Sequence, residues 1–185
     1  MTAAAGPARL HPRASLAAQF RQLGVRPGGA VPVHAAMRPL GFVCGGPQAV
    51  VLADRIVADH SRADMLGEVS PLARLYGLDA DVLLLGVDHG SNTSLHLAEY
   101  RQPAPPRQRC GAAVPTADGG GREWVWWDDV VLEEGDFARL GADFEATGAV
   151  RIGPVGDGTG RLMRQRAAVD FAVDWLARNR RTEET

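Results

Sequence analysis

The chain has 185 residues, 45% of them apolar and 23% charged, and its formal net charge is −2. These values are typical of a globular protein and exclude a collagen-like or wholly disordered chain, and they provide no basic surface for nucleic acid. All 20 basic residues are arginines, and Cys44 and Cys110 are the only cysteines, so we expect neither lysine chemistry nor a disulfide scaffold. No apolar run is long enough to span a membrane or to form a secretory signal. We therefore expect no membrane association and a cytoplasmic location.

The N-terminal part of the chain predicts one helix and one strand. Residues 1–14 are expected to form a loose arm, and residues 15–185 a single domain. Apolar residues at helical spacing predict a helix that is capped by Ser15 and ended by Gly24. The weak alternation of Ala30–His34 predicts a short strand, in which Pro32 removes one ladder hydrogen bond.

A glycine-rich loop follows, and a buried strand lies further along the chain. The loop Ala35–Gly46 precedes Pro47, which is typical of a first helical residue, so a helix is predicted over Gln48–His60. Ser70-Pro71 predicts another helix start, with an end near Gly77. The continuous apolar run Asp81–Val87 predicts a strand that is buried on both faces, as in a parallel sheet.

The C-terminal half predicts two further helices around a less regular region. A helix capped by Ser91-Asn92-Thr93 is expected to reach Arg101. Residues 102–121 are rich in proline and glycine and predict a loop, whereas Glu123–Leu132 predicts a strand. The run Gly153–Gly160 predicts a flexible lead-in to a last helix over Leu162–Arg178. Alternating strands and helices indicate an α/β fold.

His96 and Glu99 form the most informative pair of polar residues. They follow the best core strand, at the sheet edge where α/β proteins bind ligands, and their spacing of three places them on one helical face. A carboxylate beside an imidazole orients it and raises its basicity, as a general base requires. The alternative is a structural or solvent-facing helix histidine. A metal site is disfavoured because no third ligand is close in sequence.

The loop from His34 to Gly46 is a second candidate site. A glycine loop before a helix offers free backbone N–H groups to a phosphate, and Arg38 could add a positive charge. An ordinary strand-to-helix loop is the alternative. The acidic segment 122–145 is interpreted as a solvated face, although it could also suit a polycation. The neighbouring tryptophans are interpreted as strand packing.

Several segments, in the same order, resemble the aminoglycoside 3-N-acetyltransferase family. The most specific is the run Asn92–Glu99 (N-T-S-L-H-L-A-E), and the resemblance extends from about Ser15 to Arg180. Other matching segments are Leu23–Gly28, Val33-His34, Leu40-Gly41-Phe42, Gly45–Val50, Leu66-Gly67-Glu68, Ser70–Tyr76, Leu83–Val87, Arg161–Met163 and Asp170–Leu176.

The resemblance implies a three-layer α/β/α sandwich with a mixed sheet. It implies an enzyme that uses acetyl-CoA as co-substrate and no metal, and an acceptor that is the 3-amino group of a 2-deoxystreptamine aminoglycoside, an activity that gives antibiotic resistance. His96 and Glu99 match the family's catalytic positions. The family's coenzyme A region matches His34, Ala35, Ala36, Met37, Arg38, Gly41, Gly45 and Gly46.

The chain departs from the family pattern in two ways. Ala35 and Ala36 replace two serines that would contact the coenzyme. The chain is also shorter by several tens of residues, and the missing block, which would join near Val51–Arg55, would hold a core strand and much of the acceptor site. The alternative to an active enzyme is therefore an impaired, internally deleted relative that retains at most coenzyme A binding. An edge exposed beside Leu83–Val87 is expected to favour a homodimer or aggregation.

Overall fold

The computed structural model describes residues 10–11, 13–29, 31–35, 42–43, 66–115 and 120–180. At its centre is a four-stranded mixed sheet in the order β2-β4-β8-β7. Its strands, in that order, are Val33–Ala35, Asp81–Leu85, Gly158–Arg164 and Arg151–Val155. β4 runs parallel to β2, with Ala35 opposite Leu85, and antiparallel to β8, with Leu85 opposite Gly160. The mixed sheet expected from the family resemblance is confirmed.

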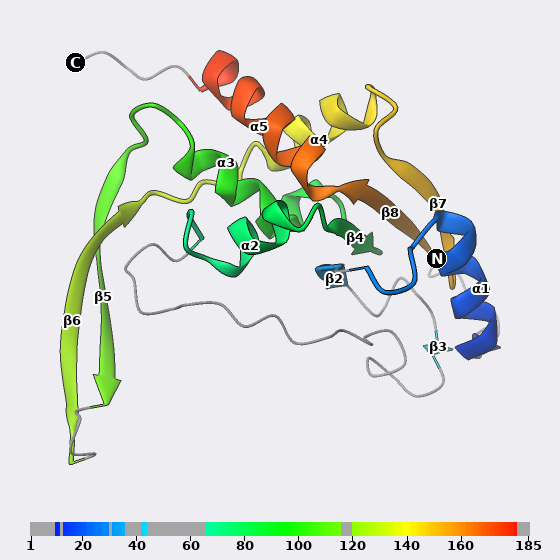
Figure 1. Ribbon diagram of the computed structural model, residues 1–185, viewed down its shortest axis with the longest axis horizontal. Coiled ribbons are helices and arrows are strands. Elements are labelled where there is room, and N and C mark those ends of the chain that lie inside the picture. Colours follow the sequence, from blue (N-terminus) through cyan, green and yellow to red (C-terminus); the bar gives the residue numbers. More distant parts are fainter. Residues whose placement is uncertain are drawn as a thin grey trace, which may run out of the picture.

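β4 is the core strand that the sequence predicts, and all five of its residues are buried. Val82 and Leu84 pack on one face against residues of helices α2 (Pro71–Gly77), α3 (His96–Tyr100), α4 (Phe137–Glu145) and α5 (Gln165–Asn179). Leu83 and Leu85 pack on the other face with α1 (Arg13–Leu23). Helices thus cover both faces, which confirms the three-layer sandwich (Figure 1).

Both edges of β4 are hydrogen-bonded to neighbouring strands. The expectation of an unpaired edge beside Leu83–Val87 is therefore wrong, because β2 occupies one side of β4 and β8 the other. The strand on the second side, β8, takes in the end of the glycine-rich run that the sequence predicts as a flexible lead-in, and also residues 162–164, which the sequence predicts as the start of the last helix. That run forms instead the β7–β8 hairpin, with Gly156 in its turn at φ 60°.

The helix ends follow local chemistry in two of the predicted positions. Ser70 caps α2, and its side chain accepts a hydrogen bond from the Leu72 N–H. Gly24 ends α1 in the left-handed region, at φ 101°. Ser15, however, lies inside α1 rather than at its cap, because the helix begins two residues earlier at Arg13.

A long β-hairpin replaces the loop that was predicted over residues 102–121. β5 (Arg107–Pro115) pairs with β6 (Arg122–Val130) through nine residue pairs, and the hairpin projects away from the sandwich (Figure 1). The rings of Trp124 and Trp126 stack with their centroids 5.4 Å apart and are 64% and 53% exposed. Trp124 and Trp126 therefore pack against each other on the exposed face of the strand.

A short parallel pair, β1 (Leu10–His11) and β3 (Phe42–Val43), completes the strands of the described chain. The helix predicted over Gln48–His60 and most of the predicted arm 1–14 lie outside the described residues. Within the described ranges, no helix is long and apolar enough to cross a membrane.

Candidate active site

Two short capped turns carry the chain from β4 to the histidine that the sequence singles out. The Asp88 side chain accepts a hydrogen bond from the Gly90 N–H at the start of the 3-10 turn η3 (His89–Ser91). The Asn92 side chain accepts one from the Ser94 N–H at the start of η4 (Thr93–Leu95). α3 then begins at His96 itself. The capping side chains of Asp88 and Asn92 therefore fix the path of the chain between β4 and His96.

His96 and Glu99 form a buried hydrogen-bonded pair. His96 Nδ1 lies 2.6 Å from Glu99 Oε2, and the two residues are only 8% and 2% exposed. Their spacing of three residues places both side chains on the same face of α3, as the sequence predicts. The His96 ring also packs, tilted, against the Phe137 ring at the start of α4, with the centroids 4.9 Å apart. The pair is thus held on the inner side of α3.

The second oxygen of Glu99 is fully occupied by residues that are distant in sequence. Glu99 Oε1 accepts a hydrogen bond from the Glu133 N–H at 3.0 Å and another from Arg180 Nη1 at 2.5 Å. Arg180 follows the end of α5 and also pairs with Asp136. Burial by itself lowers the pKa of Arg180, but its hydrogen bonds to Asp136 and Glu99 outweigh that effect and raise the pKa above its usual value.

These contacts assign distinct roles to the two ring nitrogens of His96. Because Glu99 Oε2 is the acceptor at 2.6 Å, Nδ1 is assigned as the ring nitrogen that carries the hydrogen and donates the hydrogen bond. Nε2 is neither hydrogen-bonded to a described residue nor among the buried unpaired atoms of that part of the chain. Nε2 is therefore open to a substrate and can accept a proton, while the carboxylate behind the ring stabilises the imidazolium that forms.

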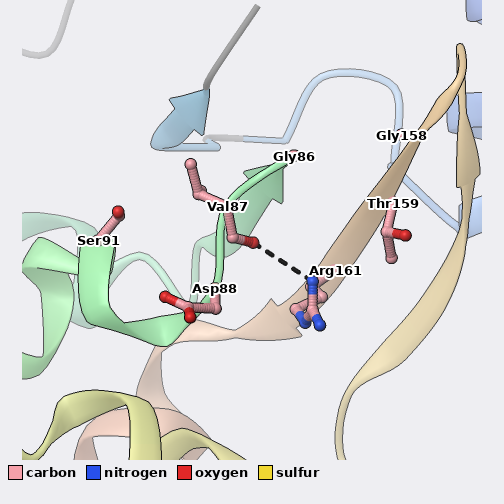
Figure 2. Close-up of a pocket in the computed structure, with 7 residues that line it drawn as sticks. All are labelled: Gly86, Val87, Asp88, Ser91, Gly158, Thr159 and Arg161. Atoms are coloured by element: carbon pink, nitrogen blue, oxygen red, sulfur yellow. Dashed lines mark hydrogen bonds between the residues drawn. The ribbon is translucent and has the colours of Figure 1, made fainter. Parts of the chain in front are cut away.

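A separate cavity of about 460 Å³ lies beyond the carboxyl ends of β2 and β4. It is lined by Gly86, Val87, Asp88, Ser91, Gly158, Thr159 and Arg161 (Figure 2). Arg161 donates to the Val87 carbonyl at 3.3 Å and to Glu145 at 2.7 Å. This is the sheet edge at which α/β proteins bind ligands. His96 and Glu99 are not among the described lining residues.

The residues of the predicted coenzyme region are only partly described. His34 and Ala35 lie on β2 and pair with Leu84 and Leu85 of β4. They are therefore close to the cavity, whose lining begins at the next residue of that chain segment, Gly86. Burial lowers the pKa of His34, and its Nε2 is buried without a hydrogen-bond partner among the described residues. The other predicted positions lie outside the described residues: Ala36, Met37, Arg38, Gly41, Gly45 and Gly46.

A second histidine–carboxylate pair is joined to the cavity through Arg161, one of its lining residues. His89 is 2% exposed, and its Nε2 lies 3.2 Å from Glu145 Oε1, the oxygen that also pairs with Arg161. Burial lowers the pKa of His89, and the Glu145 carboxylate opposes that shift only in part. The His89 ring is packed against Gly141 of α4. No spacing in the sequence links His89 to Glu145, because they are 56 positions apart in the printed numbering.

Sequence reasoning misses the residues that complete the His96 site. Arg180, Asp136 and the Glu133 N–H come from the end of α5 and the segment before α4. The only signal in the sequence is the acidic character of segment 122–145, which is interpreted above as a solvated face. Among the described residues, no group of three or more His, Cys, Asp or Glu side chains is arranged to hold a metal ion.

The chain is similar to one protein family and to several of its members. The family model described as aminoglycoside 3-N-acetyltransferase matches residues 52–177. An aminoglycoside N(3')-acetyltransferase-like protein, YokD, of Bacillus subtilis is 39% identical over 126 residues, which are 68% of this chain and 46% of that protein. Aminoglycoside N(3)-acetyltransferase VII of Streptomyces paromomycinus is 35% identical over 67% of this chain and 48% of its own length.

The structural comparison extends over more of the chain than the sequence matches do. The solved structure of AAC-IIIb in a binary complex with CoASH has a TM-score of 0.79 and 21% identity, over 96% of this chain and 100% of that one. At that identity the match shows the shared fold. The chain spans about half the length of the curated relatives it matches.

Proposed function

Because the chain belongs to the aminoglycoside 3-N-acetyltransferase family, we propose that it transfers an acetyl group from acetyl-CoA to the 3-amino group of a 2-deoxystreptamine aminoglycoside. The observation that carries this proposal is the buried His96–Glu99 pair, with Nδ1 fixed by the carboxylate and Nε2 open to a substrate. The pair lies inside the segment that matches the family model.

In the proposed reaction, His96 Nε2 takes the proton that the acceptor amine loses. The amine nitrogen bonds to the acetyl carbonyl carbon, and the carbon–sulfur bond breaks to release the thiolate, which His96 then protonates. Glu99 stabilises the imidazolium between these two steps. The chain has no lysine, and Cys110, the cysteine that the structure describes, lies on the β5–β6 hairpin, so direct transfer with both substrates bound is favoured. General-base assistance of this kind typically contributes about 10²–10⁴-fold to the rate.

Acetyl-CoA is proposed to bind at the carboxyl ends of β2 and β4. This edge carries His34 and Ala35 and the cavity with Arg161, Ser91 and Thr159, groups that suit a phosphorylated ligand. The AAC-IIIb structure, which shares the fold, is a complex with CoASH. A cytoplasmic location is part of the same proposal, since a reducing compartment suits Cys110, which forms no disulfide within the described part of the chain.

The shortening relative to the family is proposed to be internal. The structural alignment spans the whole of AAC-IIIb, whereas the sequence alignments cover about half of the curated relatives. The family model also begins to match at residue 52, close to the junction that the sequence predicts near Val51–Arg55. Since the missing block would include much of the acceptor site, a chain that binds coenzyme A without transfer is the second candidate.

Purified protein distinguishes these two functions. With acetyl-CoA and a 2-deoxystreptamine aminoglycoside, thiol release and an acceptor product heavier by one acetyl group are expected. His96→Ala should lower turnover by about 10²–10⁴-fold with coenzyme A binding nearly unchanged, and His11→Ala, on β1, is the matched control. Calorimetric binding of coenzyme A without thiol release would support the second candidate. Full turnover of His96→Ala across neutral pH would refute the role of His96.

A further inference from the structure

Arg180 links the catalytic pair to a second carboxylate. Its Nη1 donates to Glu99 Oε1 at 2.5 Å. Its Nε and Nη2 donate to the two oxygens of Asp136, at 2.8 and 2.5 Å, and Nη2 also donates to the Glu133 carbonyl. The Arg180 guanidinium therefore connects three parts of the fold: the end of α5, helix α3, and the segment that precedes α4. The bidentate geometry with Asp136 fixes the plane of the guanidinium and so the direction of Nη1.

The charges along this chain of contacts alternate. Glu99 is negative, Arg180 positive and Asp136 negative, so the three groups together carry one net negative charge beside His96. That charge is balanced when the His96 ring takes up a proton. Without Asp136, the positive charge of Arg180 would cancel that of Glu99, and the buried imidazolium would lose its compensation.

We propose that Arg180 and Asp136 are positioning residues for His96: Arg180 holds Glu99 ionised and aligned, and Asp136 neutralises Arg180 so that Glu99 remains free to stabilise the protonated ring. This inference rests on the proposed acetyl transfer for its consequence in catalysis. It goes beyond the His–Glu pair because the two residues act through Glu99 and not on a substrate.

The surroundings of His96 are consistent with control by these groups. Among the described residues, three charged side chains form the hydrogen-bonded network with His96: Glu99 on α3, Arg180 after α5 and Asp136 before α4. Glu133 joins this network through its backbone N–H and carbonyl, while its carboxylate accepts a hydrogen bond from the Gly135 N–H at 2.7 Å. Phe137 also contacts the network, because its ring lies against His96 and 5.7 Å from the guanidinium carbon of Arg180.

Two charge-changing variants are expected to act in opposite directions. Asp136→Asn removes a negative charge but keeps an oxygen that accepts from Arg180, so the protonated ring is less stable and the midpoint of the His96 ring titration moves to lower pH. Arg180→Gln removes the positive charge, so the midpoint moves to higher pH. Each change should be roughly one pH unit. The Arg180→Gln/Asp136→Asn double variant restores the net charge of the network, so the midpoint of its His96 titration should lie close to that of the parent protein.

The ring titrations are followed by NMR of the folded protein without substrate, with the His96 signal assigned from its loss in His96→Ala. A merely structural role for Arg180 predicts no change in either midpoint, or a change in the same direction in both variants, and either result would overturn the inference. If Arg180→Gln fails to fold, Asp136→Asn decides alone, since it leaves the guanidinium contacts of Glu99 in place.

Kinetics supply the second readout. Arg180→Gln and the double variant both deprive Glu99 Oε1 of a donor, so kcat should fall on the order of 10–100-fold, less than in His96→Ala, with the KM for acetyl-CoA nearly unchanged. Arg180→Lys should recover part of that loss. Opposite shifts of the titrations without any acetyl transfer would support the charge arrangement and refute the proposed function. Transfer with unmoved titrations would refute the arrangement alone.

Discussion

Gly141 of α4 is predicted to be a position where alanine destabilises the protein, although alanine favours helices. A Cβ built at Gly141 would lie 2.0, 2.1 and 2.4 Å from the Cγ, Cβ and Cδ2 atoms of His89. Carbon atoms normally pack at about 3.5–4.0 Å, so α4 and η3 would have to separate by roughly 1.5 Å. The ring cannot easily turn away, because it is 2% exposed and stands edge-on to Phe144.

The expected size follows from two opposing effects. Alanine in place of glycine inside a helix gains about 1 kcal/mol, whereas overpacking of a buried site costs about 1–3 kcal/mol and here belongs at the upper end. Gly141→Ala should therefore lower the free energy of unfolding by about 2 kcal/mol. Gly77→Ala is the matched control, because Gly77 ends α2, is exposed and has no atom within 4 Å of the added Cβ; a change between zero and a gain of about 1 kcal/mol is expected.

Urea unfolding followed by tryptophan fluorescence measures both variants, with equal m-values required for the comparison. Adding His89→Ala to Gly141→Ala should cost less than the two changes separately, by more than about 1 kcal/mol, because the atoms that clash are then absent. If Gly141→Ala is as stable as Gly77→Ala, the packing of α4 on η3 is not as close as described and the reasoning fails.

Three other predictions concern acid stability, the His96–Glu99 pair and the hairpin. His34 and His89 have lowered pKa values in the folded state, so below their ordinary value of 6.5 the unfolded chain binds more protons. The free energy of unfolding should therefore fall as the pH decreases from about 7 to 5.5, and more gently in a His34→Asn/His89→Asn variant; a stability independent of pH in this range would contradict it. Glu99→Gln should lower turnover less than His96→Ala, and the double variant should be little worse than His96→Ala, since the two residues act as one unit; additive losses in the thiol-release assay would argue for separate roles. The exposed pair Trp124 and Trp126 provides an apolar surface on the hairpin, and replacing both with threonine should reduce concentration-dependent association in light scattering; unchanged association would place any dimer contact elsewhere.

Sequence reasoning succeeds where a feature depends on neighbouring residues. β4 is predicted correctly because a run of apolar residues can be buried only between two layers. The Ser70 cap and the Gly24 end of helices are local hydrogen-bonding and backbone preferences. The His96–Glu99 contact is equally local, because a spacing of three residues brings two side chains together on any helix.

The β7–β8 hairpin shows where local reasoning fails. Glycines normally weaken strands, so the run Gly153–Gly160 predicts a flexible segment. In the fold, a Cβ at Gly153 would lie 3.3 Å from Leu23, and one at Gly160 would lie 3.0 Å from the same side chain. The glycines therefore make room for α1 on the sheet. The need for small residues at these positions comes from Leu23 of α1, some 130 residues earlier in the chain. The sequence of the two strands therefore shows no periodic pattern that would reveal it.

The sequence by itself determined the family resemblance, the core strand, and the histidine and glutamate on one helix, because each depends on residue types at short spacing. Only the tertiary structure decided that Glu99 is held by Arg180, 81 positions away, and that Asp136 balances that arginine. The physical reason is that an ion pair is specified by proximity in space and by burial. A sequence shows an arginine after the last helix and an acid before α4, but nothing in either position indicates that both face the same carboxylate.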